Sequence, residues 1–198
     1  MPSIRVAPLP GKGLGTVATR CINRGEIIIA ERPLVKRDED VRTGQTHEYS
    51  GGNREDALNK LLTLCQASKG KDAVERVLKA NSFVVQEGAY TRFPVRWTRL
   101  AFLNISRVNH SCSPNAEFVY HAADATATVK ALKPIAPGDE VCINYGAEGA
   151  LSERQDFLSR SFEFDCRCER CVQEMGQQKH QMKPRVEMNF SAGSRRNR

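Results

Sequence analysis

The sequence contains no apolar run long enough to cross a membrane. A spanning helix needs about 20 consecutive apolar residues, and no stretch of the 198-residue chain approaches that length. The first residues, MPSIRVAPLPGKGLG, also lack the apolar centre of a secretory signal peptide. We therefore expect an intracellular protein, nuclear or cytoplasmic, without membrane contact.

The cysteine count does not suit a disulfide framework. The chain has 7 cysteines, an odd number, and a reducing compartment disfavours disulfides, so close cysteine spacing is better explained by metal binding. Internal repeats are also missing, which excludes solenoids and repeat arrays.

The composition is that of one soluble globular domain. Hydrophobic residues make up 40% of the chain and charged residues 27%, which is too apolar for a disordered protein. The net charge of +7 is concentrated at the end, because residues 176–198 hold six Lys or Arg and one Glu. We expect this segment to be a basic, disordered tail, which offers at most a weak contact for an acidic partner or nucleic acid. The remainder is expected to be a monomer.

The hydrophobic pattern changes period along the chain and predicts an α+β protein, mainly β, with small irregular sheets. Short β-rich runs at 13–20 and 26–31 predict a hairpin, and the polar stretch 36–52 predicts a loop or insertion site. The expected helices span 56–66 with Asn53 as N-cap, 72–81, 97–108 after Pro94, and 152–161 with Ser152 and Gln155 as a capping box. Further strands are expected at 116–121, 125–131 and 140–145, the first two as a hairpin.

Three cysteines near the end have the spacing of a metal site. Cys166, Cys168 and Cys171 form C-x-C-x-x-C, and a structural Zn²⁺ takes four tetrahedral ligands, so a fourth is needed from elsewhere. Cys112 is the obvious donor, with free thiols as the alternative. The other three cysteines lie in apolar, regular segments, where we expect ordinary core residues: Cys21, Cys65 and Cys142.

Cys112 belongs to the motif NHSCSPNA, residues 109–116, which otherwise suits a polar turn. Asn109 can donate and accept hydrogen bonds to a ligand, whereas His110 alone would more often be a buried histidine held by backbone bonds. Tyr145, before Gly146 at the end of a strand, could equally be an aromatic residue packed on the core.

Taken together, the motifs resemble those of the SET-domain protein lysine methyltransferases, and within them the SET-and-MYND (SMYD-type) branch. Five matches in order carry the resemblance: GKGLG (11–15), NSF (81–83), NHSCSPNA (109–116), GDEVCINYG (138–146) and FDCRCERC (164–171). They extend over residues 10–172.

The resemblance implies a SET fold with a threaded pseudoknot, S-adenosylmethionine as methyl donor and a structural zinc ion. The implied organisation is a SET domain at 1–148 with a helical insert at about 53–108, a zinc-binding post-SET segment at 149–175 and the tail at 176–198. The implied cofactor-binding residues are Lys12, Leu14, Asn81, Asn109, His110, Tyr145 and Phe164. Tyr145 is the implied catalytic residue, and the implied zinc ligands are Cys112, Cys166, Cys168 and Cys171.

The implied substrate is a lysine of a histone or another protein, which would make the chain a chromatin regulator if the target is a histone. Two features differ from the branch: residues 36–52, where a MYND zinc module would be inserted, contain no cysteine, and 27 residues follow Cys171 in place of a long helical domain. A catalytically silent SET module that binds a partner is therefore the alternative. A zinc-organised nucleic-acid binder is a third reading, which lacks base-stacking aromatics and a groove-reading helix.

Overall fold

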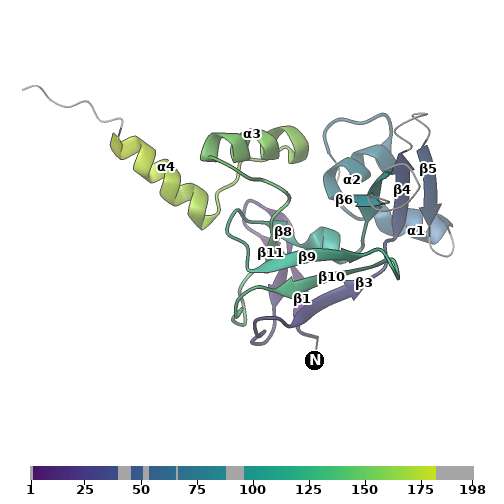
Figure 1. Ribbon diagram of the computed structural model, residues 1–198, viewed down its shortest axis with the longest axis horizontal. Coiled ribbons are helices and arrows are strands. Elements are labelled where there is room, and N and C mark those ends of the chain that lie inside the picture. The colour runs from purple at the N-terminus through teal and green to yellow at the C-terminus, as the bar shows by residue number, and fades with distance from the viewer. Residues whose placement is uncertain (1, 40–45, 51–53, 66, 88–95, 182–198) are drawn as a thin grey trace, which may run out of the picture.

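The computed structural model describes residues 2–39, 46–50, 54–65, 67–87 and 96–181. Small β-sheets form the body of these residues, and helices cover it on one side (Figure 1). This is the α+β, mainly β architecture that the sequence predicts. No helix in the described ranges is both long and apolar enough to cross a membrane.

Three groups of strands form the body. A three-stranded antiparallel sheet has the order β3 (Ile27–Glu31), β10 (Thr126–Ala131), β9 (Ala116–His121). The other two groups are the antiparallel pair β1 (Ile4–Leu9) and β2 (Gly13–Ala18), and the short parallel pair β8 (Asn109–His110) and β11 (Cys142–Ile143). Alternate residues of β10 are buried, as expected for a strand with one face on a core.

The main core lies between these strands and the 3₁₀ helix η1 (Ile105–Arg107). Phe102, Ile105 and Val108 are completely buried there beside Val129 and Ile143. Because Val108 precedes β8 and Ile143 belongs to β11, the core anchors both strands of the parallel pair.

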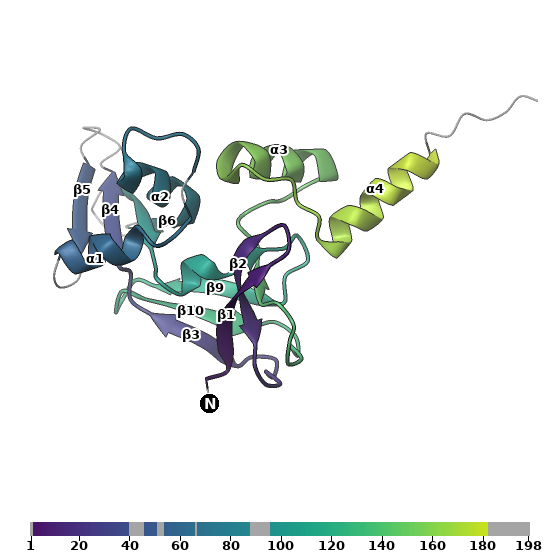
Figure 2. The same cartoon turned by 180° about the vertical axis from the view of Figure 1, so that it is seen from behind.

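A second lobe lies beside the body (Figure 2). Its sheet has the order β5 (Thr46–Ser50), β4 (Val35–Glu39), β7 (Arg96–Ala101), β6 (Ser82–Glu87), and its helices are α1 (Arg54–Leu61) and α2 (Ala73–Asn81). Asp72 caps α2 by accepting a hydrogen bond from the backbone N–H of Glu75 at 2.8 Å. Leu61, Val77 and Leu78 pack this lobe with almost no exposure.

Two helices end the described chain. α3 (Leu151–Phe162) lies above the body, and α4 (Glu169–Gln181) extends away from it in both views (Figures 1 and 2). A third apolar cluster joins α3 to the cysteine segments through Leu151, Leu158, Cys112 and Cys171. The last turns of α4 occupy 176–181, the beginning of the expected tail, whose remaining residues 182–198 lie outside the described residues.

Several sequence predictions are confirmed. The hairpin at 116–121 and 125–131 is β9 and β10, and β10 shows the alternation of apolar and polar residues that marks a half-buried strand. The helices expected at 56–66, 72–81 and 152–161 correspond to α1, α2 and α3. Asn53 and Pro94, predicted to begin two helices, lie outside the described residues.

Two predictions about strands were wrong. The runs at 13–20 and 26–31 do not form a hairpin with each other, because β2 pairs with β1 and β3 pairs with β10. The buried Ile22 between them bridges to Ile135, so this connection runs into the core instead of turning back at the surface. The expected loop at 36–52 contains most of β4 and all of β5, which pair with each other despite their charges. Residues 40–45 and 51–53 of that stretch are not described.

The expected helix at 97–108 was also wrong. Thr98 and Leu100 are completely buried, whereas Trp97 is 45% exposed, which is the alternation of a strand, and β7 occupies this segment. The following turn is held by Glu31, whose Oε1 accepts hydrogen bonds from the backbone N–H groups of Asn104 and Ile105 at 2.9 and 2.6 Å. The charged Glu31 side chain on β3 therefore holds the turn between the end of β7 and the start of η1.

Smaller corrections concern a cap and the isolated cysteines. Ser152 and Gln155 do not form a capping box, because the backbone N–H of Ala150 donates to Glu153 at 2.6 Å. Gln155 instead exchanges hydrogen bonds with both backbone groups of Cys166, at 2.7 and 2.9 Å. Of the three cysteines expected in the core, Cys142 is buried but Cys21 and Cys65 are exposed.

Candidate active site and metal centre

Hydrogen bonds join the segment NHSCSPNA, residues 109–116, to β11 and the residues just before it. Ser111 N–H donates to the carbonyl of Ile143 at 2.9 Å, which extends the β8–β11 pair. The amide of Asn115 donates to the carbonyl of Glu140 and accepts from the N–H of Cys142, both at 2.8 Å. Asn115, which the sequence reasoning did not single out, therefore fixes the register of the two segments that carry the site.

His110 connects the strand end to the cysteine cluster. The side chain is 6% exposed, and Nδ1 accepts a hydrogen bond from the backbone N–H of Tyr145 at 3.1 Å. Burial, with the positive charges of Arg154 and Lys12, lowers the pKa of His110 to about 4, so the ring is neutral near pH 7. With Nδ1 as acceptor, the ring proton is on Nε2, which lies 3.2 Å from Cys112 Sγ. The structure thus shows the buried histidine held by the backbone, in contact with a predicted metal ligand.

A carboxylate joins two of the predicted cofactor-binding residues. Glu140 Oε2 lies 2.5 Å from Lys12 Nζ, and Glu140 Oε1 accepts from Asn109 Nδ2 at 2.9 Å. Burial opposes the charge of Lys12, but the bond to Glu140 raises the pKa of Lys12 above its ordinary value. Sequence reasoning missed Glu140, although it lies within the GDEVCINYG motif.

The glycine turn, residues 11–15, lets the backbone of β2 approach Asn109 and Glu140 closely. Gly11 and Gly13 have φ of +71°, a conformation that favours glycine. A Cβ at Gly15 would lie 2.6 Å from Asn109 Nδ2 and 3.3 Å from Glu140 Oε1. The strand can therefore sit against the Asn109 and Glu140 side chains only because residue 15 has no side chain.

Tyr145 lies at the junction of these groups. Its hydroxyl donates to the carbonyl of Val108 at 2.8 Å, and its ring centroid lies 5.3 Å from that of His110 and 4.8 Å from that of Phe162. Burial raises the pKa of Tyr145 well above its ordinary value of about 10. The group is thus a neutral phenol, whose oxygen can still accept a hydrogen bond while it donates to Val108.

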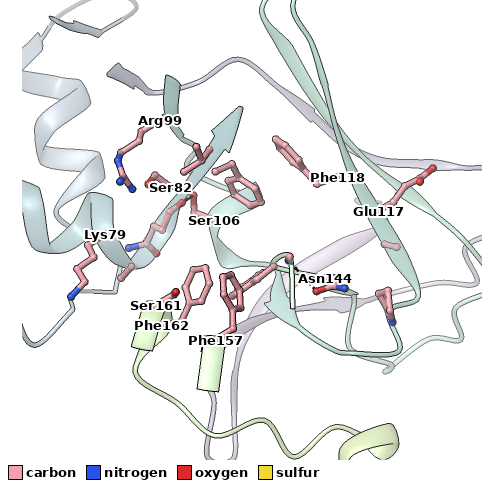
Figure 3. A pocket seen from close by; sticks show the side chains of 18 of the residues that line it. Lys79, Ser82, Arg99, Ser106, Glu117, Phe118, Asn144, Phe157, Ser161 and Phe162 are labelled. Atoms are coloured by element: carbon pink, nitrogen blue, oxygen red, sulfur yellow. Dashed lines mark hydrogen bonds between the residues drawn. The ribbon is translucent and has the colours of Figure 1, made fainter. Parts of the chain in front are cut away.

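Tyr145 also lines a groove of about 780 Å³. Figure 3 shows Phe118, Phe157 and Phe162 along it, with Lys79 and Arg99 toward one end and Glu117 toward the other. The elements that line the groove include α2, β6, β7, η1, β9, the segment after β11 and α3. The polar side chains of Ser82, Ser106 and Asn144 line it as well, so its wall combines aromatic, polar and charged groups.

The three remaining predicted cofactor-binding residues lie at different places. Asn81 lines the groove, and its Nδ2 donates to the carbonyls of Cys65 and Val77 at 2.5 and 2.7 Å. Phe164 packs near the cysteines, with its ring centroid 6.1 Å from that of His110. Leu14, just before Gly15 on β2, is 48% exposed.

Side-chain contacts and chain adjacency thus link five of the seven predicted residues. Lys12 and Asn109 meet at Glu140, Asn109 precedes His110, and the His110 ring lies near those of Tyr145 and Phe164. Asn81 lines the same groove as Tyr145.

The four cysteines predicted as zinc ligands come together. Their Sγ atoms all lie within 4.8 Å of one another, with 3.9 Å between Cys112 and Cys166 and 3.6 Å between Cys112 and Cys171. Tetrahedral coordination with Zn–S distances of about 2.3 Å requires sulfur atoms about 3.8 Å apart. The donor set therefore fits a structural zinc ion in both chemistry and spacing.

The thiols of the cluster differ in how readily they lose a proton. Burial raises the pKa of Cys166 to about 11, so a metal would displace its proton on binding. Burial also opposes ionisation of Cys168, but hydrogen bonds with Cys171, Cys112 and Cys166 outweigh it and lower the pKa to about 6. At least one thiol in the cluster is thus readily ionised near pH 7.

Comparisons with known proteins agree with the geometry. The SET domain family model matches residues 13–146. A histone-lysine N-methyltransferase of Schizosaccharomyces pombe, set5, is 27% identical over 84% of this chain and 50% of its own length. A SET and MYND domain-containing protein of Dictyostelium discoideum is 37% identical over 37% of this chain and 22% of its own. The mouse protein-lysine N-trimethyltransferase SMYD5 is 36% identical over 37% and 18%.

These relatives are longer than the part that matches. The chain spans half the length of the Schizosaccharomyces pombe relative and about a fifth of the other two. The family model, in contrast, covers the β-strands from β2 to β11 and all the residues from Gly13 to Gly146. This chain therefore belongs to the SET-domain family.

Proposed function

We propose that this chain is an S-adenosylmethionine-dependent protein-lysine N-methyltransferase, acting on a lysine of a histone or another protein. The observation that carries the proposal is the place of Tyr145: its ring neighbours that of His110, and the residue also lines the groove. A methyl donor held near His110 and an acceptor amine in the groove would therefore both lie near Tyr145.

The residues on the glycine-turn side fit the methionine end of this cofactor, which carries one carboxylate and one ammonium group. Lys12 would hold the carboxylate, and Glu140 would hold the ammonium group while it positions Asn109. Phe164 offers an aromatic face for the adenine. When bound, the cofactor supplies a methyl group on a sulfonium that is open to displacement by an amine.

The groove side fits the acceptor. A lysine side chain entering beside Tyr145 passes Phe118 and Phe162, and such an apolar passage disfavours the charged form of the amine. The lysine must lose its proton before it attacks, because its pKa in water is about 10.4. The Tyr145 oxygen would accept a hydrogen bond from the amine and hold it in line with the methyl group, and such alignment accounts for a large part of catalysis of this kind.

The zinc ion is proposed to be structural. Cys112, Cys166 and Cys171 share an apolar cluster with Phe162, Phe164 and Tyr145. A metal that crosslinks residues 112 and 166–171 would hold the two phenylalanines against Tyr145. Metal binding would then contribute folding free energy to this corner of the molecule.

The test is incubation with deuteromethyl-labelled S-adenosylmethionine and either a histone mixture or a cell extract, followed by mass spectrometry of lysine-containing peptides. We expect labelled methyl groups on specific lysines with the wild-type chain and strongly reduced labelling with Tyr145→Phe. If the chain binds the cofactor but labels no lysine in either mixture, the catalytically silent binding module is the better description.

A further inference from the structure

Arg154 on α3 is an unusual residue for its position. Its side chain has no exposed surface, and it is the only Lys, Arg, Asp or Glu that is buried in the described part of the chain. Removing a cation from water costs several kcal/mol unless it is paired and hydrogen-bonded. A buried arginine therefore needs partners that offset the cost of its desolvation.

The partners of Arg154 lead to the cysteine cluster. Nη1 donates to the carbonyl of Gly149 at 2.7 Å, and Nη2 donates to Glu174 Oε2 at 2.7 Å. Nη2 also lies 3.7 Å from Cys171 Sγ, within reach of a hydrogen bond to sulfur. Its Nε is buried without a partner among the described atoms. The guanidinium thus links the start of α3, α4 and one of the four cysteines.

Glu174 alone does not fully neutralise the positive charge of Arg154. Its side chain is 30% exposed and also accepts from Arg170 Nε at 2.8 Å, so two arginines share one carboxylate. A zinc ion held by four thiolates carries a net charge of −2, and Arg154 lies directly against that group. With zinc bound, the four thiolates would supply the missing negative charge.

We propose that Arg154 is an outer hydrogen-bond donor of the zinc centre, which positions Cys171 as a thiolate and offsets part of the charge of the four sulfur ligands. His110 acts in the same way on Cys112, since its Nε2–H lies 3.2 Å from that sulfur. Each of these two ligands thus has a donor beyond the metal. This inference rests on the cysteine cluster and does not depend on methyl transfer.

Zinc binding by purified full-length variants tests the proposal. Arg154→Gln removes the charge and the fork of donors, and Arg160→Gln is a matched control, because Arg160 lies on the same helix but is 80% exposed and pairs with Asp156 at the surface. Loss of such outer partners typically costs 10–100-fold in metal affinity. We expect Arg154→Gln to lose that much affinity in competition with a zinc chelator and Arg160→Gln to bind like the wild type.

A second readout separates a positioning role from a merely structural one. With Co²⁺ in place of zinc, the sulfur-to-metal charge-transfer bands report the electronic state of the thiolates. We expect these bands to shift in Arg154→Gln and not in Arg160→Gln. Unchanged metal affinity and unchanged bands in a variant that only melts earlier would overturn the proposal.

If Arg154→Gln does not fold, Glu174→Gln gives an independent test. This change removes the carboxylate that shares Nη2 and leaves the guanidinium to the sulfur, so zinc affinity should be maintained or increased. A loss of affinity of 10-fold or more in Glu174→Gln would contradict the assigned role. The proposal is tested in either case without any measurement of methyl transfer.

Discussion

Replacement of Tyr145 by phenylalanine removes one oxygen atom from the centre of the site. The ring contacts with His110 and Phe162 remain possible, because they involve the aromatic faces and edges. What is lost is the hydrogen bond to the carbonyl of Val108 and the hydroxyl that we propose orients the amine. The two losses have separate consequences.

The effect on stability follows from the first loss. Val108 is completely buried, and a buried carbonyl left without a donor costs about 1–3 kcal/mol. For a chain of this size each kcal/mol lowers Tm by about 2–4 °C. We therefore expect a folded variant with a modestly lower melting temperature.

The effect on catalysis follows from the second loss. Misplacing a reacting group by about 1 Å costs roughly 100-fold in rate, so we expect methyl transfer to fall by about this factor. Cofactor affinity should stay the same, because Lys12, Glu140 and Asn109 are untouched. Single-turnover transfer to a lysine peptide, with calorimetric titration of the cofactor, separates the two quantities.

The pH dependence provides a further check on Tyr145. Because burial raises its pKa well above about 10, the phenol keeps its proton throughout the range of about pH 6 to 9. The rate should rise with pH as the lysine deprotonates, with the same shape in wild type and Tyr145→Phe. Equal transfer rates in the two proteins, or a profile that loses a pH-dependent step in the variant, would refute this role of the hydroxyl.

Three other predictions concern the metal and the ion pair. Cys112→Ser should lower the amount of bound zinc, measured by atomic absorption, as much as Cys168→Ser does. The control Cys21→Ser, at an exposed cysteine, should keep the full amount of zinc. A normal zinc content in Cys112→Ser would show that Cys112 is not a ligand. Chelation of zinc should lower Tm and slow methyl transfer together, and a chelated protein with unchanged melting would show that the metal is not structural. Glu140→Gln should weaken cofactor binding by about 10-fold, because a hydrogen bond to a charged group contributes about 1.5–3 kcal/mol and the exposure of Lys12 reduces that contribution. The exposed Glu148→Gln serves as the control. Unchanged affinity in Glu140→Gln would place the cofactor elsewhere.

The sequence predicted best where a local pattern decides the structure. β10 follows from the alternation of its apolar and polar residues, and α2 follows from its apolar stripe. The cysteine cluster follows from ligand spacing within six residues plus one candidate in a motif. In each case the controlling interactions lie within a short stretch of chain, so one sequence is enough to find them.

The misses involve partners far apart in the chain. β7 was mistaken for a helix, because its exposed Trp97 and its link to β4 and β6 are consequences of tertiary pairing. Glu140 lies 128 residues from Lys12, and nothing local indicates that the two side chains meet.

The burial of Arg154 is another feature that depends on partners far apart in the chain. An arginine on an amphipathic helix with Gln155 and Asp156 beside it is typical of a solvent-facing position. Only the packing of α3 against the cysteines and α4 makes it the largest completely buried side chain of the described residues. The sequence could name the four cysteines that cluster but not the arginine that contacts them.

The most direct test of the central claim is a crystal structure with S-adenosylhomocysteine and a methylated lysine peptide bound together. We expect the homocysteine end against Lys12, Glu140 and Asn109, the peptide in the groove beside Phe118, and the lysine nitrogen within hydrogen-bond distance of the Tyr145 oxygen. Both ligands on the same side of Tyr145, or a lysine nitrogen remote from its hydroxyl, would contradict it.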